Sequence, residues 1–261
     1  MKLNLILAAS VLALAGAAHA AAPACSTTSA PHTTALVELY TSEGCDSCPA
    51  ADRWLSSLSA QGFKPDRVVP LALHVDYWDY IGWKDPFAKG EFAVRQHKLA
   101  KMRRPAIVYT PQVLLQGQDF RRWGSSAFPE AVARINAKPA RARITLSIDA
   151  VTPGAIQAGL VAQLFDPADL KKAAVYLAAY ENKLASDVRA GENRGKRLEH
   201  DFVVREWIGP IGFGEGLKLE EKRALPLLPG AHPKHLGVAA FVQNRSNSEV
   251  LQALMLPACS S

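Results

Sequence analysis

The chain has 261 residues, of which 49% are hydrophobic and 21% charged, an ordinary composition for a globular protein, and its formal net charge is +6. The Lys and Arg residues are scattered in short runs that we interpret as solvated surface, and we expect no nucleic-acid partner. After residue 20 no apolar run approaches the length of about eighteen residues that a membrane-spanning helix needs, so we expect no stable membrane insertion of the mature chain.

Residues 1–20 have the pattern of an export signal peptide. Lys2 precedes an apolar core over residues 3–14, and small residues lead to Ala20, after which we expect cleavage. The apolar core is too short to cross a membrane. We therefore expect a periplasmic or secreted protein, in a compartment where disulfides persist.

Between residues 33 and 138, strand-like and helix-like segments alternate, which predicts an α/β domain. Short apolar runs predict strands at residues 36–40, 68–75, 107–109 and 112–116. Apolar residues at helical intervals predict helices at residues 50–58, 88–101 and 127–137. An aromatic loop over residues 76–87 separates the second strand from the second helix.

From residue 139 to residue 257 the pattern changes to short apolar or alternating runs separated by Pro, Gly, Asn and Asp. This spacing is typical of antiparallel strands joined by turns. We expect strands at residues 144–151, 155–165, 173–180, 202–207, 238–243 and 250–255, and a brief helical turn at residues 167–172. The second part of the chain is therefore predicted to be an all-β, sandwich-like domain.

Cys45 and Cys48 form a Cys-x-x-Cys motif where an expected strand turns into a helix. The partial positive charge and free N–H groups of a helix N-terminus stabilise a thiolate, the form that attacks disulfides. We expect Cys45 to be an exposed nucleophile and Cys48, one helical turn later, to close the disulfide. The motif alone also fits a structural disulfide or half of a zinc site, but no second pair of ligands at the usual spacing follows.

Four cysteines allow three pairings, of which we favour Cys45–Cys48 together with Cys25–Cys259. The second bond would join the two tails of the mature chain, which otherwise show no strand or helix pattern. On the loop-entropy model it would contribute roughly 4–5 kcal/mol to stability. The alternative is two free terminal thiols.

Thr110 and Pro111 lie between two strand-like runs, downstream of the expected thiol helix. A cis bond at this position can bring backbone N–H and C=O groups beside the thiols, where they would pair with an extended peptide. We therefore predict that the Thr110–Pro111 bond is cis.

These motifs together resemble the thioredoxin-like superfamily: a strand, a Gly-Cys-x-x-Cys-Pro turn into a helix, a second strand, an insertion, and Thr-Pro between strands. More narrowly, the chain is similar to the bacterial family of secreted proteins designated domain of unknown function 1223. The segments that carry this similarity are residues 37–52, 74–87, 109–112 and 191–195, with Leu198, His200 and residues 203–205.

The resemblance implies that the α/β domain at residues 33–138 is thioredoxin-like, while the mainly antiparallel β, sandwich-like domain at residues 139–257 is predicted from the strand pattern alone. It also implies a role for Glu38, which lies near the position of the buried acid of thioredoxins and could accept the proton of the second thiol. The alternative for Glu38 is a carboxylate held by a salt bridge. The implied site residues are then Cys45, Cys48, Thr110, Pro111 and Glu38.

Two further segments have open interpretations. The aromatic side chains of residues 77–83 either form a small core beneath the inserted helix or frame a groove for an apolar substrate segment. The turn from Gly191 to Gly195 either satisfies its own polar groups or presents Glu192, Asn193 and Arg194 to a partner or back toward the first domain.

The leading functional hypothesis is a thiol–disulfide oxidoreductase that needs no dissociable cofactor. Its partners would be a protein or small thiol or disulfide substrate, and an electron donor or acceptor of the cell envelope. The negative charge of Asp46 should raise the pKa of Cys45, which argues against an extreme oxidant. The alternatives are a Cu(I)-binding module, with Cys45 and Cys48 helped by His74 or His97, and a non-catalytic envelope interaction protein.

Overall fold

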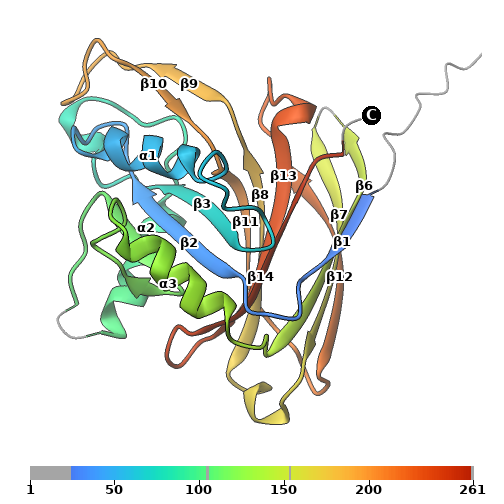
Figure 1. The fold of residues 1–261 in the computed structure, drawn as a ribbon. Helices are drawn as coiled ribbons and strands as arrows, with labels where there is room; N and C mark the ends of the chain where they lie inside the picture. The colour runs from blue at the N-terminus through green and yellow to red at the C-terminus, as the bar shows by residue number, and fades with distance from the viewer. Residues whose placement is uncertain (1–24, 104–105, 153, 260–261) are drawn as a thin grey trace, which may run out of the picture.

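The computed structural model describes residues 25–103, 106–152 and 154–259 (Figure 1). The expected signal peptide at residues 1–20 lies outside the described residues. Within the described part of the chain, no helix is both long enough and apolar enough to span a membrane.

Three α-helices are described: α1 (Cys48–Ser57), α2 (Gly90–Lys101) and α3 (Ala127–Asn136). The strands of the first half are β1 (Cys25–Thr28), β2 (Ala35–Thr41), β3 (Val68–His74), β4 (Gln112–Leu115) and β5 (Gln118–Asp119). Those of the second half are β6 (Ala142–Thr152), β7 (Ala155–Leu164), β8 (Ala173–Glu181), β9 (Leu184–Asp187), β10 (Arg197–His200), β11 (Val203–Gly212), β12 (Lys218–Pro226), β13 (Leu236–Asn244) and β14 (Val250–Pro257).

One mixed sheet of eight strands joins both halves of the chain, in the order β14-β13-β8-β11-β3-β2-β4-β5. The pairs β2–β3 and β3–β11 are parallel, and the other neighbours are antiparallel. The parallel pairing of Ala72 with Val203 is the point at which strands of the two halves meet. The change of pattern near residue 139 therefore does not coincide with a break in this sheet.

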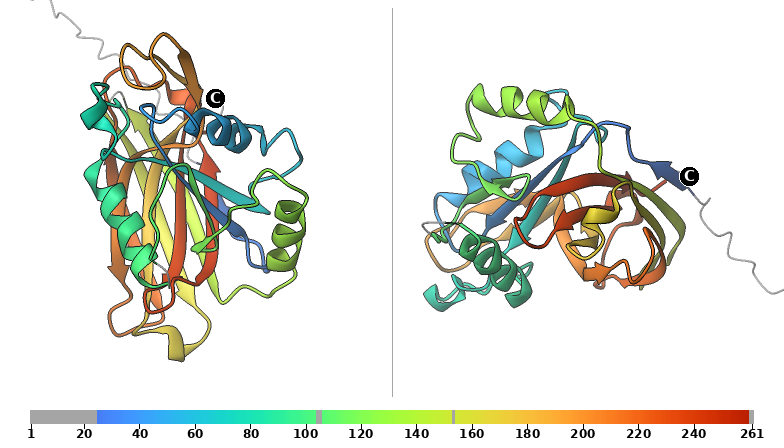
Figure 2. Two further views of the ribbon diagram at one scale, coloured as in Figure 1. Left: turned by 90° about the vertical axis from the view of Figure 1, so that its left-hand side faces the viewer. Right: turned by 90° about the horizontal axis from the view of Figure 1, so that it is seen from below.

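Helices cover both faces of the sheet around β2 and β3, with α1 and α3 on one face and α2 on the other (Figure 2). Every residue of β2 and β3 is buried, as expected for strands covered on both faces. Helix α1 has Pro49 in its first turn, where the missing N–H costs nothing, and buries Cys48, Ala51, Asp52 and Leu55. The carboxyl ends of β2 and β3 therefore lie beside the start of α1.

A second sheet, β1-β6-β7-β12, is fully antiparallel and packs against β8, β13 and β14. Side chains of β8 point alternately to the two faces of the sheet, so this strand contributes to two hydrophobic cores. Ala174, Tyr176, Ala178 and Tyr180 join the core that includes the helices, while Val175, Leu177 and Ala179 join the core between the two sheets. The antiparallel packing predicted for the second half is thus present, but part of it is built by the large shared sheet.

Both predicted disulfides are confirmed. Cys25 pairs with Cys259 with a Cα–Cα distance of 6.1 Å, and Cys45 pairs with Cys48. The expectation that the N-terminal tail lacks regular structure is wrong, because Cys25–Thr28 forms β1 and pairs with β6. A four-residue strand with a half-exposed, polar sequence gives no apolar pattern from which it could be recognised.

Most of the apolar runs named above form the expected elements, with ends shifted by a few residues. The strand predicted at residues 107–109 is absent, because this segment runs along the surface and Ile107 is 44% exposed. Strands β9, β10 and β12 were not predicted, since they are short or rich in charged residues.

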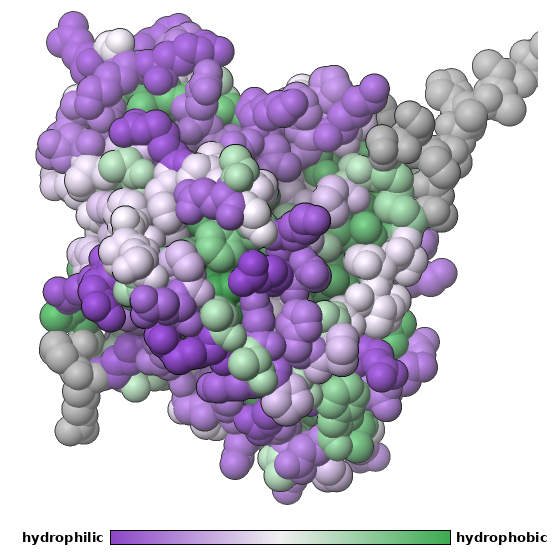
Figure 3. Space-filling model, in the orientation of Figure 1, coloured by the Kyte–Doolittle hydropathy of each residue, from purple (hydrophilic) through white to green (hydrophobic). Residues whose placement is uncertain are grey.

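The face seen in Figure 1 is mostly hydrophilic, and its hydrophobic residues form small separate patches (Figure 3). Large continuous apolar patches mark many protein interfaces. On this face, recognition of a partner would therefore depend mainly on polar groups.

Candidate functional site

The thiol turn, residues 42–47, connects the end of β2 to the start of α1. The Cys45 N–H donates to the Ser42 carbonyl at 3.2 Å, and the Cys48 N–H donates to the Cys45 carbonyl at 3.3 Å. These bonds bring the two Cα atoms of Cys45 and Cys48 to 5.5 Å, within the usual span of a disulfide. Cys48 is the first residue of the helix, and Cys45 lies three residues before it.

The expectation of an exposed Cys45 is wrong: its side chain is 1% exposed, and Cys48 is fully buried. The turn from Gly191 to Gly195, whose two glycines have positive φ angles, contacts the backbone of the thiol turn. Asn193 donates from Nδ2 to the carbonyls of Glu43 at 2.8 Å and of Cys45 at 2.7 Å. This turn therefore points back to the thiol turn, which is one of the two interpretations left open by the sequence.

Glu192 adds two further hydrogen bonds to the thiol turn. Its N–H donates to the Gly44 carbonyl at 3.3 Å, and its carboxylate accepts the Asp46 N–H at 2.9 Å. Asp46 and Ser47, between the two cysteines, remain exposed. Glu192 and Asn193 thus both bind the turn from Gly191 to Gly195 to the thiol turn.

The predicted cis Thr110–Pro111 bond is confirmed. Gln112, the next residue, pairs with Tyr40 near the end of β2, so Thr110 and Pro111 lie at the same end of the sheet as the thiol turn. The Trp78 indole donates to Thr110 Oγ1 at 2.6 Å, and a Cβ at Gly44 would lie 3.3 Å from Trp78 Cβ. The aromatic loop therefore packs between the Thr-Pro turn and the thiol turn.

Glu38 is held by a salt bridge. Its side chain lies on the opposite face of β2 from that of Thr41, because the two residues are three positions apart along the strand. Arg95 of α2 donates to both carboxylate oxygens, at 2.6 and 3.1 Å. Tyr40 donates to the same carboxylate at 3.2 Å. Both oxygens of the Glu38 carboxylate thus bind Arg95, in agreement with the alternative of a carboxylate held by a salt bridge.

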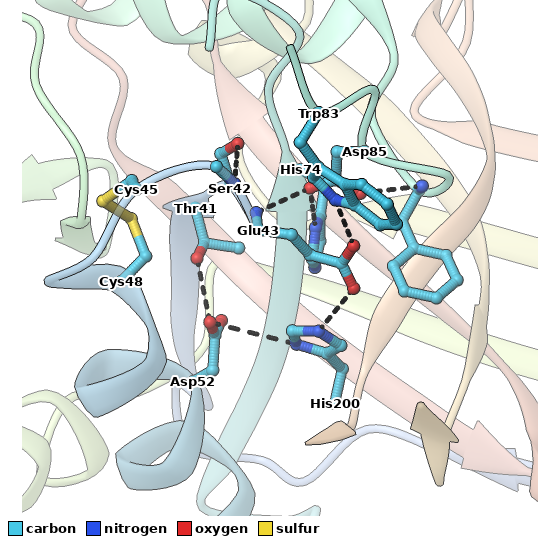
Figure 4. Close-up of polar contacts among 12 residues, drawn as sticks. Thr41, Ser42, Glu43, Cys45, Cys48, Asp52, His74, Trp83, Asp85 and His200 are labelled. Atoms are coloured by element: carbon cyan, nitrogen blue, oxygen red, sulfur yellow. Dashed lines mark hydrogen bonds and ion pairs between the residues drawn. A yellow bond between two sulfur atoms is a disulfide. The ribbon is translucent and has the colours of Figure 1, made fainter. Parts of the chain in front are cut away.

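A buried polar cluster adjoins the thiol turn and consists of Glu43, Asp52, His74, Asp85 and His200 (Figure 4). Asp52 lies four residues after Cys48 on α1, His74 ends β3, and His200 ends β10. In the view of Figure 4 the disulfide lies at one edge of the cluster and the histidines at the other, with Thr41 and Asp52 between them.

Each histidine of the cluster has a carboxylate partner. His74 Nδ1 lies 2.7 Å from Asp85 Oδ2, and His200 Nε2 lies 3.0 Å from Glu43 Oε1. The carboxylates are themselves held: Asp85 accepts the N–H groups of Glu43 and Phe87, both at 2.9 Å, and Glu43 accepts the Trp83 indole N–H at 2.8 Å. The two carboxylates therefore fix the orientation of both imidazole rings.

Asp52 lies against the histidines from the helix side. Thr41 Oγ1 donates to Asp52 Oδ2 at 3.1 Å, and the same oxygen lies 3.9 Å from His200 Nδ1. Burial raises the pKa of Asp52, an effect that His200 and His74 partly offset. Burial alone would lower the pKa of His74, but the Asp85 carboxylate outweighs it and raises that pKa. In agreement, His74 lowers the pKa of Asp85 despite its burial.

His74 and His200 are both recognisable in the sequence, but their grouping with Asp52 and Glu43 in one cluster was not predicted. A signal for Asp52 was present, because residues four apart on a helix lie on the same face, here that of Cys48. No local signal indicates that His200, 157 residues after Glu43, meets it. His97, considered above as a copper ligand, lies on the exposed side of α2 and does not join the cluster.

Comparison with solved structures gives two similar chains over most of this one. The protein AGR_C_4864 from Agrobacterium tumefaciens is 26% identical with a TM-score of 0.63, over 88% of this chain and 96% of that one. HBP35 of Porphyromonas gingivalis is 15% identical with a TM-score of 0.65, over 89% of this chain and 79% of that one. The second likeness concerns the fold alone.

The comparison with curated proteins gave no match. The comparison with family models matched residues 36–243, most of the chain, to the family described as "Protein of unknown function (DUF1223)". The matched range contains both the thiol turn and the buried polar cluster. The chain therefore belongs to the DUF1223 family.

Proposed function

We propose that this protein is an exported, thioredoxin-like thiol–disulfide oxidoreductase that acts through Cys45 and Cys48. The observation that carries the proposal is the Cys45–Cys48 disulfide at the start of α1. A sulfur in this position lies near the N–H groups of the first helical turn, which stabilise a thiolate after reduction. A presence outside the cytoplasm is supported by the second disulfide, Cys25–Cys259, because such bonds persist in oxidising compartments.

The order of elements in the first half supports the thioredoxin-like assignment. Elements β2-α1-β3-α2-β4-β5-α3 follow one another, and the four strands take the sheet order β3-β2-β4-β5. A parallel pair with a crossover helix is followed by an antiparallel hairpin, with helices on both faces. This arrangement brings the Thr110–Pro111 turn and the thiol turn to one end of the sheet.

The reaction exchanges one disulfide for another. The Cys45 thiolate attacks a substrate disulfide, forms a mixed disulfide and releases one substrate thiolate. The Cys48 thiolate then attacks the Cys45 sulfur, releases the second substrate thiolate and restores the Cys45–Cys48 bond. The substrate gains two electrons and the cysteine pair loses two, so a dithiol reductant of the envelope must reduce the pair again.

Cys45 is buried, so part of its surroundings must move before a substrate reaches its sulfur, and we propose that the turn at residues 191–195 is the cover that moves. The turn is held mainly by Asn193, which is buried, and by the exposed Glu192. Only a few hydrogen bonds have to break for this motion, and each contributes roughly 0.5–1.5 kcal/mol net. A cover of this strength slows exchange without preventing it.

The test is to trap the mixed disulfide. A Cys48→Ser protein, added to exported extracts, should accumulate covalent adducts that dithiothreitol releases, because the second step is blocked. The matched control, Cys45→Ser/Cys48→Ser, should form none. The proposal fails if Cys48→Ser forms no adducts, even when Asn193→Ala is added to loosen the cover.

A second candidate function is favoured by the burial of Cys45, which is 1% exposed. In this alternative the disulfide only stabilises the thiol turn, and the protein is a non-catalytic interaction module of the envelope. The pair would then resist reduction by mild dithiols under native conditions. Reduction within minutes by a small dithiol would exclude this alternative.

A further inference from the structure

Three buried side chains from three separate elements converge beside the thiol turn: Asp52 from α1, His74 from β3 and His200 from β10. Each offers one ligand atom, and these atoms all lie within 4.8 Å of one another. The residues are 5%, 0% and 2% exposed. Polar side chains buried to this degree normally have all their polar atoms paired.

Two ring nitrogens in this group have no hydrogen-bond partner among the described residues: His74 Nε2 and His200 Nδ1. On each ring the opposite nitrogen faces a carboxylate, Asp85 for His74 and Glu43 for His200. An ionised carboxylate only accepts, so that opposite nitrogen carries the proton, and a neutral ring keeps a lone pair on the unpartnered nitrogen. When both rings are neutral, two lone pairs and the Asp52 carboxylate are gathered in one buried space, where a metal ion would replace any proton on these nitrogens.

The surrounding charges favour a cation in this space. Asp52, Asp85 and Glu43 bring three carboxylates to two imidazoles, all of them buried. Among the described residues, no Lys or Arg side chain forms an ion pair with any of these three carboxylates. When both imidazoles are neutral, a divalent cation would supply two positive charges where burial makes uncompensated negative charge costly.

We propose that Asp52, His74 and His200 bind one divalent transition-metal ion of the Zn²⁺ class, through a carboxylate oxygen, Nε2 and Nδ1 respectively. Two imidazole nitrogens and one carboxylate oxygen are a donor set suited to such ions and leave a position open for water or a substrate. The ring-to-carboxylate contacts of His74 and His200 are the outer-shell bonds that orient metal-binding histidines.

Binding requires the donor atoms to move closer together. Metal–ligand bonds of about 2.0–2.1 Å at tetrahedral angles place donor atoms roughly 3.3 Å apart. The Asp52 Oδ2 to His200 Nδ1 distance is 3.9 Å, and no two of the three donor atoms are more than 4.8 Å apart, so side-chain rotation has to bring them together around an ion. A surface pocket of about 140 Å³ is lined in part by Asp52 and His200, so solvent comes close to two of the three residues.

The proposal does not rest on the oxidoreductase function, and its test separates the two. The tag-free mature protein is stripped of metal with a chelator and kept fully oxidised, so that neither Cys45 nor Cys48 offers a thiolate. Zn²⁺ is then titrated against a chromophoric chelator, and the bound metal is counted by mass spectrometry. We expect one Zn²⁺ per chain.

X-ray absorption of the oxidised, Zn²⁺-loaded wild-type protein identifies the ligands without any substitution. The expected spectrum has nitrogen and oxygen neighbours at about 2.0–2.1 Å, scattering from two imidazole rings, and no sulfur at about 2.3 Å. A sulfur shell, fewer than two imidazoles, or the absence of stoichiometric Zn²⁺ would overturn the proposal. Misfolding of a variant cannot affect this result.

Substitutions then assign the site. His200→Ala and Asp52→Ala should each weaken Zn²⁺ binding more than about 100-fold, because loss of an outer-shell partner alone typically costs about 10- to 100-fold. Glu43→Gln should fall in that smaller range. The matched controls are His97→Ala, on the exposed side of α2, and His235→Ala, from the stacked pair His232–His235. Binding that survives His200→Ala but is lost in His235→Ala would place the ion elsewhere and refute the assignment.

Discussion

Two buried clusters of charged side chains lie on opposite faces of β2, and they differ in how completely their polar atoms are paired. On the α2 face, Glu38 and Arg95 form two hydrogen bonds, and the guanidinium also donates to Gln243 at 3.1 Å. On the α1 face, the cluster around His74 and His200 leaves one nitrogen of each ring without a partner in the described part of the chain.

The Arg95 cluster also has an aromatic surround. The guanidinium lies 4.7 Å from the ring centre of Tyr176, 5.0 Å from Trp207 and 5.2 Å from Phe241. These rings come from β8, β11 and β13, so Arg95 joins the two halves of the chain. Its complete pairing indicates a structural role, whereas the incomplete pairing around His74 and His200 indicates a place for a ligand.

The largest expected effect is on the paired cluster. Arg95→Ala should lower the free energy of unfolding by about 3–5 kcal/mol, because it leaves the Glu38 carboxylate buried without a counter-charge. Urea unfolding followed by circular dichroism measures this. The control is Arg121→Ala, which breaks the more exposed pair with Asp119 and should cost far less, because solvent screens an exposed ion pair. Equal losses in the two variants would refute the structural role of Arg95.

The next effect distinguishes the two clusters by their response to metal. Zn²⁺ at 100 times its dissociation constant should raise the free energy of unfolding by about 2.7 kcal/mol, since it binds only the folded state. Arg95→Ala should keep this increment, provided it remains folded, and His200→Ala should lose it. Thermal unfolding with and without Zn²⁺ gives both values. An increment of the same size in His200→Ala would show that the ion binds outside the cluster.

A smaller effect is expected at the cover of the disulfide. Asn193→Ala leaves the carbonyls of Glu43 and Cys45 without their donor and should cost about 1–3 kcal/mol. The same change should speed reduction of Cys45–Cys48 by dithiothreitol, because Cys45 becomes more accessible. The neighbouring exposed residue offers a control, Arg194→Ala, that should alter neither quantity. Unchanged reduction kinetics in Asn193→Ala would mean that the turn does not limit access.

Local patterns predicted the elements that carry the thiols. The apolar run at 36–40 and the helical spacing at 50–58 correspond to β2 and α1, and both disulfide pairings followed from the number and placement of the cysteines. The cis Thr110–Pro111 bond was predicted from its position between two apolar runs. Each of these inferences needed only nearby residues or a count.

Contacts between distant residues were not predictable in the same way. The thiol turn is bound by Asn193, which lies 148 residues after Cys45 and donates to its carbonyl. The large sheet is continuous because Val203 pairs with Ala72. The pairing of Glu38 with Arg95 depends on α2 crossing that face of β2. In each case the tertiary fold brings two distant residues together, and no local sequence pattern identifies the partner.

The reduction potential of the Cys45–Cys48 pair tests the proposed exchange reaction most directly. It is measured by equilibrating the mature protein with thiol–disulfide buffers and counting the reduced thiols at positions 45 and 48. A working oxidoreductase pair should lie between about −270 and −120 mV, the span from thioredoxin to strong periplasmic oxidants. A potential below about −300 mV, typical of structural disulfides, would contradict the account.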